Sequence, residues 1–165
     1  MSECKAVRLN ADTFPMDDAE REMLRAAGVT HLVEIEGRTP EEMIEAAHDA
    51  DVLLIVSAKV RRPVIERLAR CKLLCRYGTG TDNIDVDAAT EKGIYVTNVT
   101  DFCLGEMADH TMALVLGVAR KLLVMHRRMV AGQWIEARKS ETLHRLQGKT
   151  LGLLGFGNIA REVAK

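Results

Sequence analysis

The sequence predicts an α/β fold in which a mostly parallel sheet is covered by helices on both faces. Short apolar stretches typical of strands alternate with helical stretches through roughly the first hundred residues. Residues 52–56 are an apolar run without polar alternation, which is typical of a parallel strand buried on both faces. Because crossovers between parallel strands are right-handed, the repeated units predict one doubly wound layer.

The first strand–helix unit begins near the N-terminus. Residues 5–10 alternate apolar and polar side chains and predict a strand. Asp17 and Asp18 can cap a helix that runs to residue 27, and Gly28 is placed to end it in the left-handed conformation.

The second unit has the strongest helix start in this part of the chain. A strand is expected at 30–36. Thr39 then stands as the N-cap, with Pro40 at the first helical position and Glu42 reaching back from the third. The apolar strand at 52–56 follows this helix.

Further elements continue the alternation. In chain order they are a helix at 62–70, a strand at 72–77, a helix at 86–92 and a strand at 94–99. Asp85 is expected to cap the second of these helices, and Gly93 is expected to end it.

The pattern changes at residue 104, where one long helix is expected to run to about residue 131, with Gly132 closing it. Residues 112–119 are apolar nearly all round, so this helix must be covered on more than one side. A mixed, charged segment at 133–147 predicts a loop with at most one helical turn, and 151–154 predicts a short strand.

The composition narrows the class of protein. The chain has 165 residues, 47% of them hydrophobic and 28% charged, which is enough for one sizeable core. A formal net charge of −1 offers no field that would attract nucleic acid or an anionic membrane, and the apolar runs are shorter than the ~20 residues that cross a bilayer. Charged residues at the N-terminus argue against a secretory signal, and four cysteines suit a reducing compartment, so a cytoplasmic protein is expected. The cysteines have no metal-ligand pattern, so no bound metal is expected.

Residues 155–160 form a G-x-G-x-x-A motif between the predicted strand and a helix. Gly155 permits a tight turn, Gly157 the close approach of a phosphate, and Ala160 the close packing of helix on strand. The other interpretation is a strand-to-helix turn that needs small residues only for packing. The acidic residue that completes such a fingerprint, ~20 residues further on, would lie beyond Lys165.

Residues 76–83 are a second candidate, because they lie at the carboxyl end of a strand, where open α/β sheets bind ligands. Their glycines allow backbone N–H groups to converge on a carboxylate or phosphate. A glycine-rich turn in which Asp82 and Asn83 bond locally explains the same residues, and both interpretations stay open.

Four linked motifs resemble the D-isomer-specific 2-hydroxyacid dehydrogenases. They are 76–85, 93–99, 106–114 and 148–157, and their order and spacing match over about residues 50–165. Residues 98–103 are similar to the branch that holds phosphoglycerate dehydrogenases and the C-terminal binding proteins.

This resemblance implies a flavodoxin-like substrate domain at 1–100, an interdomain and dimerisation helix at 101–131, and the start of a Rossmann NAD-binding domain at 132–165. It implies hydride transfer between NAD, or NADP, and C2 of a D-2-hydroxy or 2-keto acid. An NAD-responsive co-regulator of the C-terminal binding protein type is the alternative. The helix at 104–126 would pack at a homodimer interface, with burial inside one chain as the other interpretation.

The resemblance also assigns residues. Gly78 and Gly80 would bind the substrate carboxylate through N–H groups, Thr79 would approach the nicotinamide, and Ser57 would line the substrate cleft. The dinucleotide pyrophosphate would be held by Gly155, Gly157, Asn158, Ile159 and Ala160. Val56 stands where phosphoglycerate dehydrogenases often have an arginine, which argues against a phosphorylated substrate.

The family's catalytic arginine, glutamate and histidine have no matching position in residues 1–165. His110, beside Asp109 in the long helix, matches a structural position of the family pattern. The other histidines lie in unrelated segments, so no catalytic residue is assigned: His31, His48, His126 and His144. The chain as given is therefore expected to be an incomplete part that does not turn over substrate by itself.

Overall fold

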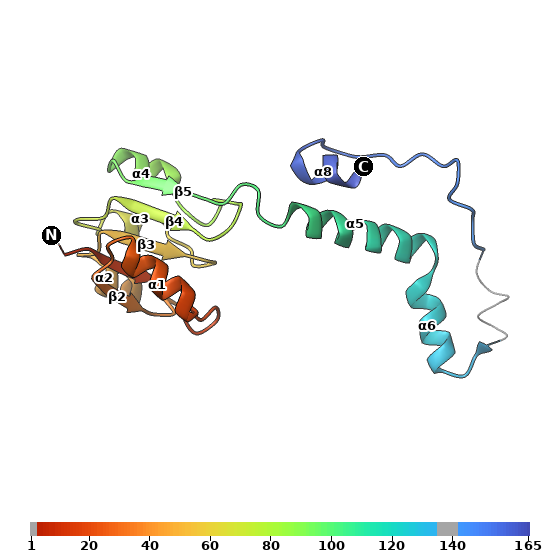
Figure 1. Ribbon diagram of the computed structural model, residues 1–165, viewed down its shortest axis with the longest axis horizontal. Coiled ribbons are helices and arrows are strands. Elements are labelled where there is room, and N and C mark those ends of the chain that lie inside the picture. The colour runs from red at the N-terminus through yellow and green to blue at the C-terminus, as the bar shows by residue number, and fades with distance from the viewer. Residues whose placement is uncertain (1–2, 135–141) are drawn as a thin grey trace. The chain divides into compact units, whose positions relative to one another are not determined.

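Five parallel strands form the sheet of the first unit, in the order β2-β1-β3-β4-β5 (Figure 1). The computed structural model describes residues 3–134 and 142–165, and the chain divides into two units, Met1–Phe102 and Cys103–Lys165. Each unit is described by itself. The strand order is that of the flavodoxin-like doubly wound fold, so the predicted fold class is confirmed.

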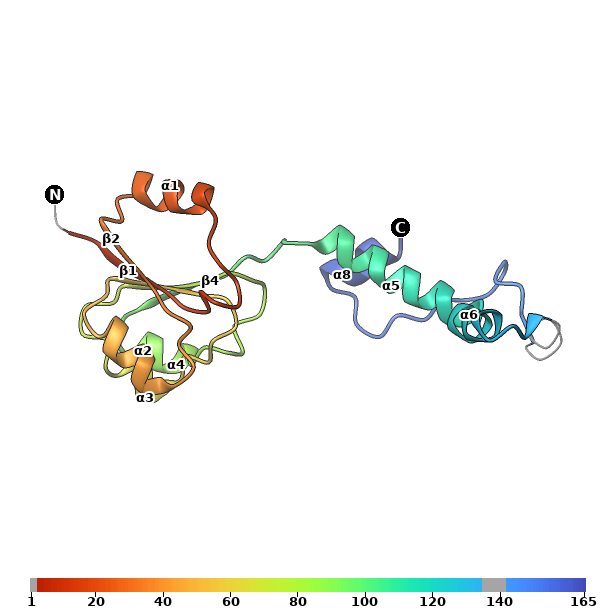
Figure 2. The same ribbon diagram turned by 90° about the horizontal axis from the view of Figure 1, so that it is seen from below.

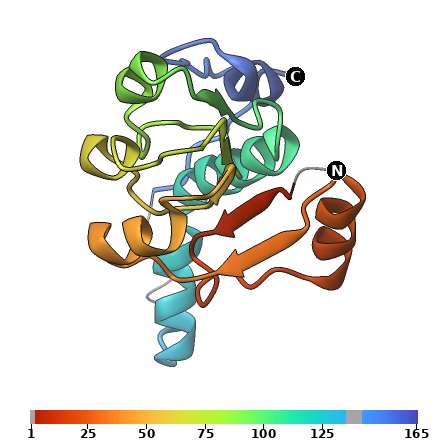
Figure 3. The same ribbon diagram turned by 90° about the vertical axis from the view of Figure 1, so that its left-hand side faces the viewer.

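Every strand predicted in the first unit is present, although each is shorter than the sequence indicates. The strands are β1 (Lys5–Arg8), β2 (His31–Glu34), β3 (Val52–Ile55), β4 (Leu73–Arg76) and β5 (Tyr95–Thr97). β1 and β2 lie side by side and point the same way, with Val7 opposite Val33 (Figure 3). β3 is the central strand, and Leu53, Leu54 and Ile55 in it are buried, as its unbroken apolar run predicts.

Helices cover the two faces of this sheet unequally (Figure 2). α1 (Asp18–Ala26) lies on one face, while α2 (Pro40–Ala47), α3 (Arg62–Ile65) and α4 (Val86–Glu91) lie on the other. Most of the buried core lies on the face covered by α2, α3 and α4. Its fully buried large side chains include Val7, Leu9, Leu53, Ile55, Val60, Val64, Ile65, Leu68 and Leu74.

The predicted N-caps of α1 and α2 are present, although the Glu42 side chain bonds to a different residue than predicted. Asp17 accepts a hydrogen bond from Glu20 N, and the Glu20 carboxylate accepts one from Asp17 N, which makes a complete capping box. Thr39 accepts from Glu42 N, but the Glu42 carboxylate accepts from Arg38 N instead of from the cap residue.

The predicted cap and helix ends of the rest of the first unit are confirmed, but one predicted helix is too long. Asp85 caps α4 by accepting from Ala88 N, and Gly28 and Gly93 adopt positive φ, as predicted. The helix expected at 62–70 is wrong in length. Only Arg62–Ile65 is α-helical, because the following N–H groups, such as that of Leu68, bond to carbonyls three residues back in turns.

The second unit contains α5 (Leu104–Ala119), α6 (Leu122–Val130) and α8 (Asn158–Val163), and α8 packs on α5. The single long helix predicted for 104–131 is wrong. Lys121 has φ 56°, and this left-handed residue interrupts the helical hydrogen-bond ladder between α5 and α6. Gly132 has positive φ at the end of α6, as expected.

The strand predicted at 151–154 is also wrong, because these residues form no ladder and Leu154 is fully exposed. An isolated strand leaves its N–H and C=O groups without partners, so it does not form without a neighbour. Part of the mixed segment predicted at 133–147 lies outside the described residues. Among the described helices, none has the length and apolar character to span a bilayer.

Candidate functional site

The carboxyl ends of β3 and β4 bring together the residues predicted to bind substrate. Ser57 follows β3, and Gly78, Thr79 and Gly80 follow β4. The two strands are neighbours, and Tyr77 N donates to Ile55 O at 2.7 Å, so the two loops leave the sheet side by side. Parallel sheets bind ligands at this edge, which agrees with the predicted position of the site.

The loop after β4 presents backbone N–H groups that have no acceptor. Within the described part of the chain, the N–H groups of Gly78, Thr79 and Gly80 make no hydrogen bond. The carbonyls are engaged instead, since Gly78 O accepts from Val99 N at 3.1 Å and Thr79 O accepts from Asn98 Nδ2 at 2.7 Å. These N–H donors are therefore available to a ligand, which suits the binding of a carboxylate or a phosphate oxygen.

The Arg76 guanidinium explains why residue 78 is a glycine. A Cβ atom on Gly78 would lie 2.5 Å from Arg76 Nη1 and 2.9 Å from Cζ. The guanidinium is fixed there because Nη1 donates to Tyr77 O at 2.7 Å and Nε donates to Asn83 Oδ1 at 3.2 Å. A positive charge thus lies directly against the loop whose N–H groups are free, which favours an anion.

Two asparagines that the sequence analysis did not assign to the site hold the loop after β3. Asn10 Oδ1 accepts from Ser57 N and from Ala58 N, both at 2.8 Å, and Asn83 Nδ2 donates to Ala58 O at 2.9 Å. Asn83 therefore does more than the local turn bonding considered for it. The one sequence signal for Asn10 is its place at the end of the predicted strand, because asparagine tolerates the positive φ (65°) found there.

An apolar cavity of about 460 Å³ borders the glycine loop on the α1 face of the sheet. Its lining residues are Glu20, Met23, Leu24, Cys75, Tyr77, Gly78, Val99 and Phe102. Burial raises the pKa of the Tyr77 phenol. The buried Arg8 guanidinium lies 4.7 Å from the centre of the Tyr77 ring, a cation–π contact.

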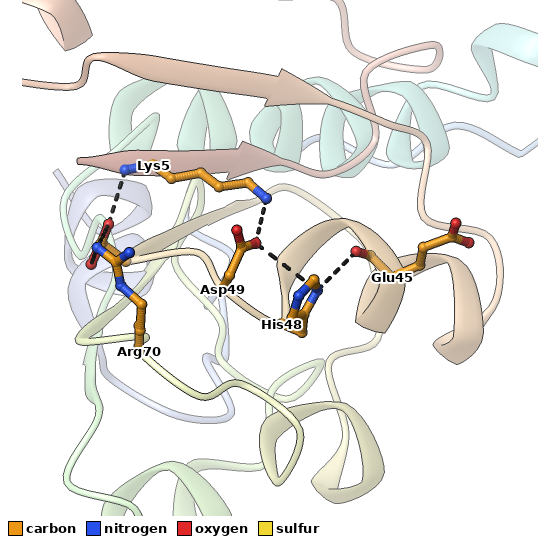
Figure 4. A network of polar contacts seen from close by, with 6 residues as sticks. Lys5, Glu45, His48, Asp49 and Arg70 are labelled. Atoms are coloured by element: carbon orange, nitrogen blue, oxygen red, sulfur yellow. Dashed lines mark hydrogen bonds and ion pairs between the residues drawn. The ribbon is translucent and has the colours of Figure 1, made fainter. Parts of the chain in front are cut away.

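A polar network lies at the opposite, amino-terminal edge of the sheet (Figure 4). Lys5 Nζ is paired with Asp49, and this hydrogen bond lowers the pKa of the Asp49 carboxyl. His48 Nδ1 lies 3.1 Å from Glu45 O and 3.9 Å from Asp49 Oδ1, so its contacts are local. Arg70 bonds to Asp51, whose carboxylate also accepts from Lys5 N. This network ties down the start of β1 and does not reach the carboxyl-end loops.

The predicted pyrophosphate residues lie together in the second unit. Gly155 has φ 87°, Gly157 is the N-cap of α8, and Asn158, Ile159 and Ala160 form the first turn. The first helical bond runs from Arg161 N to Gly157 O, so the N–H groups of those three residues have no helical acceptor. A Cβ at Gly155 or Gly157 would meet no atom within 4 Å. These residues fit a phosphate group, while the strand that should precede them is missing.

No group of three metal-ligating side chains occurs in the described ranges. The four cysteines are free thiols; Cys71 is buried, and Cys4, Cys75 and Cys103 are partly exposed. Burial raises the pKa of the Cys71 thiol.

Comparison with known proteins gives a consistent result. Residues 10–161 match the family model described as D-isomer specific 2-hydroxyacid dehydrogenase, catalytic domain. The chain is 40% identical over 154 residues to D-3-phosphoglycerate dehydrogenase of Methanocaldococcus jannaschii, covering 93% of this chain and 29% of that protein. The chain thus spans less than a third of that curated relative.

Solved structures agree with the sequence comparison. A glyoxylate reductase from Paecilomyes thermophila has a TM-score of 0.81 and 33% identity over 98% of this chain and 51% of its own. An NAD-dependent formate dehydrogenase from Staphylococcus aureus, solved with NAD, has a TM-score of 0.79 and 27% identity over 97% of this chain and 52% of its own.

Proposed function

Since the chain belongs to the D-isomer-specific 2-hydroxyacid dehydrogenase family, we propose that it supplies the substrate domain and the first cofactor-binding turn of such an oxidoreductase. The reaction is hydride transfer between a nicotinamide cofactor and C2 of a D-2-hydroxy or 2-keto acid. The observation that carries this proposal is the glycine loop at 78–80, whose three N–H groups have no acceptor among the described residues.

The proposed substrate contacts all come from the carboxyl edge of the sheet. The N–H groups of Gly78 and Gly80 hold the carboxylate, and Arg76 adds positive charge beside them. Ser57 contributes its hydroxyl, because its N–H is already bonded to Asn10. Val56, rather than an arginine, precedes Ser57, so the proposed substrate is a small acid without a phosphate group.

The proposed cofactor is NAD, with NADP as the alternative, and when bound it accepts or donates the hydride. Gly155, Gly157, Asn158, Ile159 and Ala160 hold its pyrophosphate at the start of α8, and Thr79 contacts its nicotinamide side. The proposed domain limits are those of the sequence: 1–100 for substrate, 101–131 for the connecting helices and 132–165 for the start of the nucleotide domain. The neighbour solved with NAD supports a nicotinamide cofactor.

Amide NMR spectra of the chain test the carboxylate site directly. Titration with sodium oxamate, an analogue of a 2-keto acid, is expected to shift the Gly78, Thr79 and Gly80 amide signals and to saturate. Shifts that do not saturate, or that appear elsewhere only, would refute the site. The chain alone is expected to show no NAD-dependent oxidation of D-2-hydroxy acids, since the family's arginine, glutamate and histidine are absent from it. Turnover above a blank would contradict this expectation.

The connecting helices carry the proposed homodimer contact. Leu114, Val118, Leu122 and Leu123 are 58%, 75%, 62% and 68% exposed, which is unusual for large apolar side chains. A groove of about 410 Å³ runs between these residues of α5 and α6. Sedimentation equilibrium is expected to give twice the chain mass and to give the single mass for Val118→Asp. A monomer for the unchanged chain would refute the dimer.

The co-regulator alternative and a cytoplasmic location stay predictions of the sequence. Neither a nucleic-acid nor a membrane partner is proposed.

A further inference from the structure

We propose that Asn10 and Asn83 act as a carboxamide clamp that positions Ser57 toward the substrate held by the glycine loop. This inference rests on the proposed function, because it assumes that Ser57 and residues 78–80 share one ligand. Neither asparagine touches that ligand, so both are positioning residues.

The two asparagines hydrogen-bond to the peptide groups on both sides of Ala58. Asn10 Oδ1 takes the N–H groups of Ser57 and Ala58 at 2.8 Å, while Asn83 Nδ2 donates to Ala58 O at 2.9 Å. Ala58 is 7% exposed, so water cannot easily replace these partners. The backbone on either side of Ser57 is therefore fixed, and only the exposed Ser57 side chain is left to rotate.

Each asparagine is itself held in one orientation. Asn10 N donates to Glu36 O at 3.1 Å, and Oδ1 accepts from two backbone N–H groups, which fixes the orientation of the carboxamide. Asn83 Oδ1 accepts from Arg76 Nε at 3.2 Å, which leaves Nδ2 for Ala58. Asn10 and Asn83 are 7% and 9% exposed, so both amides are shielded from solvent.

The clamp links the two halves of the proposed substrate site. Arg76 contacts the α-carbon side of Gly78 and bonds to Asn83, and Asn83 bonds to the loop that carries Ser57. The spacing between the Ser57 backbone and the free N–H groups is thus set by side chains outside the ligand. Such fixed spacing is what orients a bound acid for reaction at C2.

A double-mutant cycle with oxamate as the ligand tests the clamp. The variants are Asn10→Gly, Ser57→Ala and the double variant, and binding is read from the amide signals of residues 78–80. Glycine is chosen because it accepts the positive φ of residue 10 while removing the acceptor. Asp12→Gly is the matched control, since it loosens the same loop and, among the described residues, the Asp12 side chain bonds only to Arg38.

If Asn10 acts through Ser57, each single variant raises the oxamate Kd about tenfold and the double variant raises it no further. Asp12→Gly is expected to leave the oxamate Kd unchanged. Additive losses in the double variant, or unchanged affinity in Asn10→Gly, would overturn the clamp alone. No saturable shift in the unchanged chain would overturn the proposed function and the clamp together. If Asn10→Gly does not fold, Asn83→Ala replaces it in the same cycle.

Discussion

Replacement of Gly78 by alanine tests whether the Arg76 guanidinium requires a glycine at this position. The backbone of Gly78 does not have positive φ, so alanine meets no backbone strain there. Its Cβ would instead lie 2.5 Å from Arg76 Nη1, and the guanidinium would have to move. That movement breaks the bonds to Tyr77 O and Asn83 Oδ1.

Two hydrogen bonds from a half-buried guanidinium contribute about 2 kcal/mol together. Gly78→Ala should therefore lower the free energy of unfolding of the first unit by that amount. Gly80→Ala is the matched control, because its Cβ would meet only Asp82 Oδ1, at 2.8 Å, on an exposed side chain that can rotate away. We expect that substitution to cost less than about 0.5 kcal/mol.

Hydrogen exchange of the β3 and β4 amides measures this free energy within the first unit. The most protected of these amides should exchange roughly 30-fold faster in Gly78→Ala and nearly unchanged in Gly80→Ala. In an Arg76→Ala background the Gly78→Ala substitution should cost little further, since the obstructing group is gone. Equal exchange rates in the two single glycine variants would refute the steric argument.

Three further outcomes are expected. In Lys5→Met, the lowered pKa of Asp49 should rise toward its ordinary range in a carboxyl NMR titration. A lowered pKa adds stability that is lost as the pH falls through it. The variant should therefore lose less stability than the unchanged chain on acidification below about pH 4. Cys71 should react with iodoacetamide more slowly than the other three cysteines, because it is 5% exposed and burial raises its pKa, and urea should remove the difference as judged by mass spectrometry. Amides of residues 151–154 should exchange at rates near those of an unfolded chain, and protection equal to that of β3 would contradict their unpaired state.

Local signals were sufficient for much of the first unit. The Asp17 and Asp85 caps, the buried run of β3 and the positive φ of Gly93 each depend on a few neighbouring residues, and the structure confirms all of them. The sheet order followed from the repetition of such units together with the resemblance.

Features that depend on distant partners were not predictable in the same way. Asn10 and Ser57 are 47 residues apart, and no periodicity connects them. The left-handed break at Lys121 has no glycine or proline to mark it, and nothing else in the sequence explains it. The strand predicted at 151–154 has suitable residues, but a strand also needs a neighbour to bond with.

The two faces of the sheet in the first unit differ in how deeply their helices are buried, and therefore in local stability. α1 has no buried residue, and the Arg21–Glu34 ion pair links it to β2, whereas α2, α3 and α4 all bury side chains in the core. α1 can therefore detach at low free energy while the sheet and the other helices stay folded. Sequence change on α1 can remodel the apolar cavity next to Gly78 at little expense to the core, so this helix is where variants with altered ligand preference would be sought.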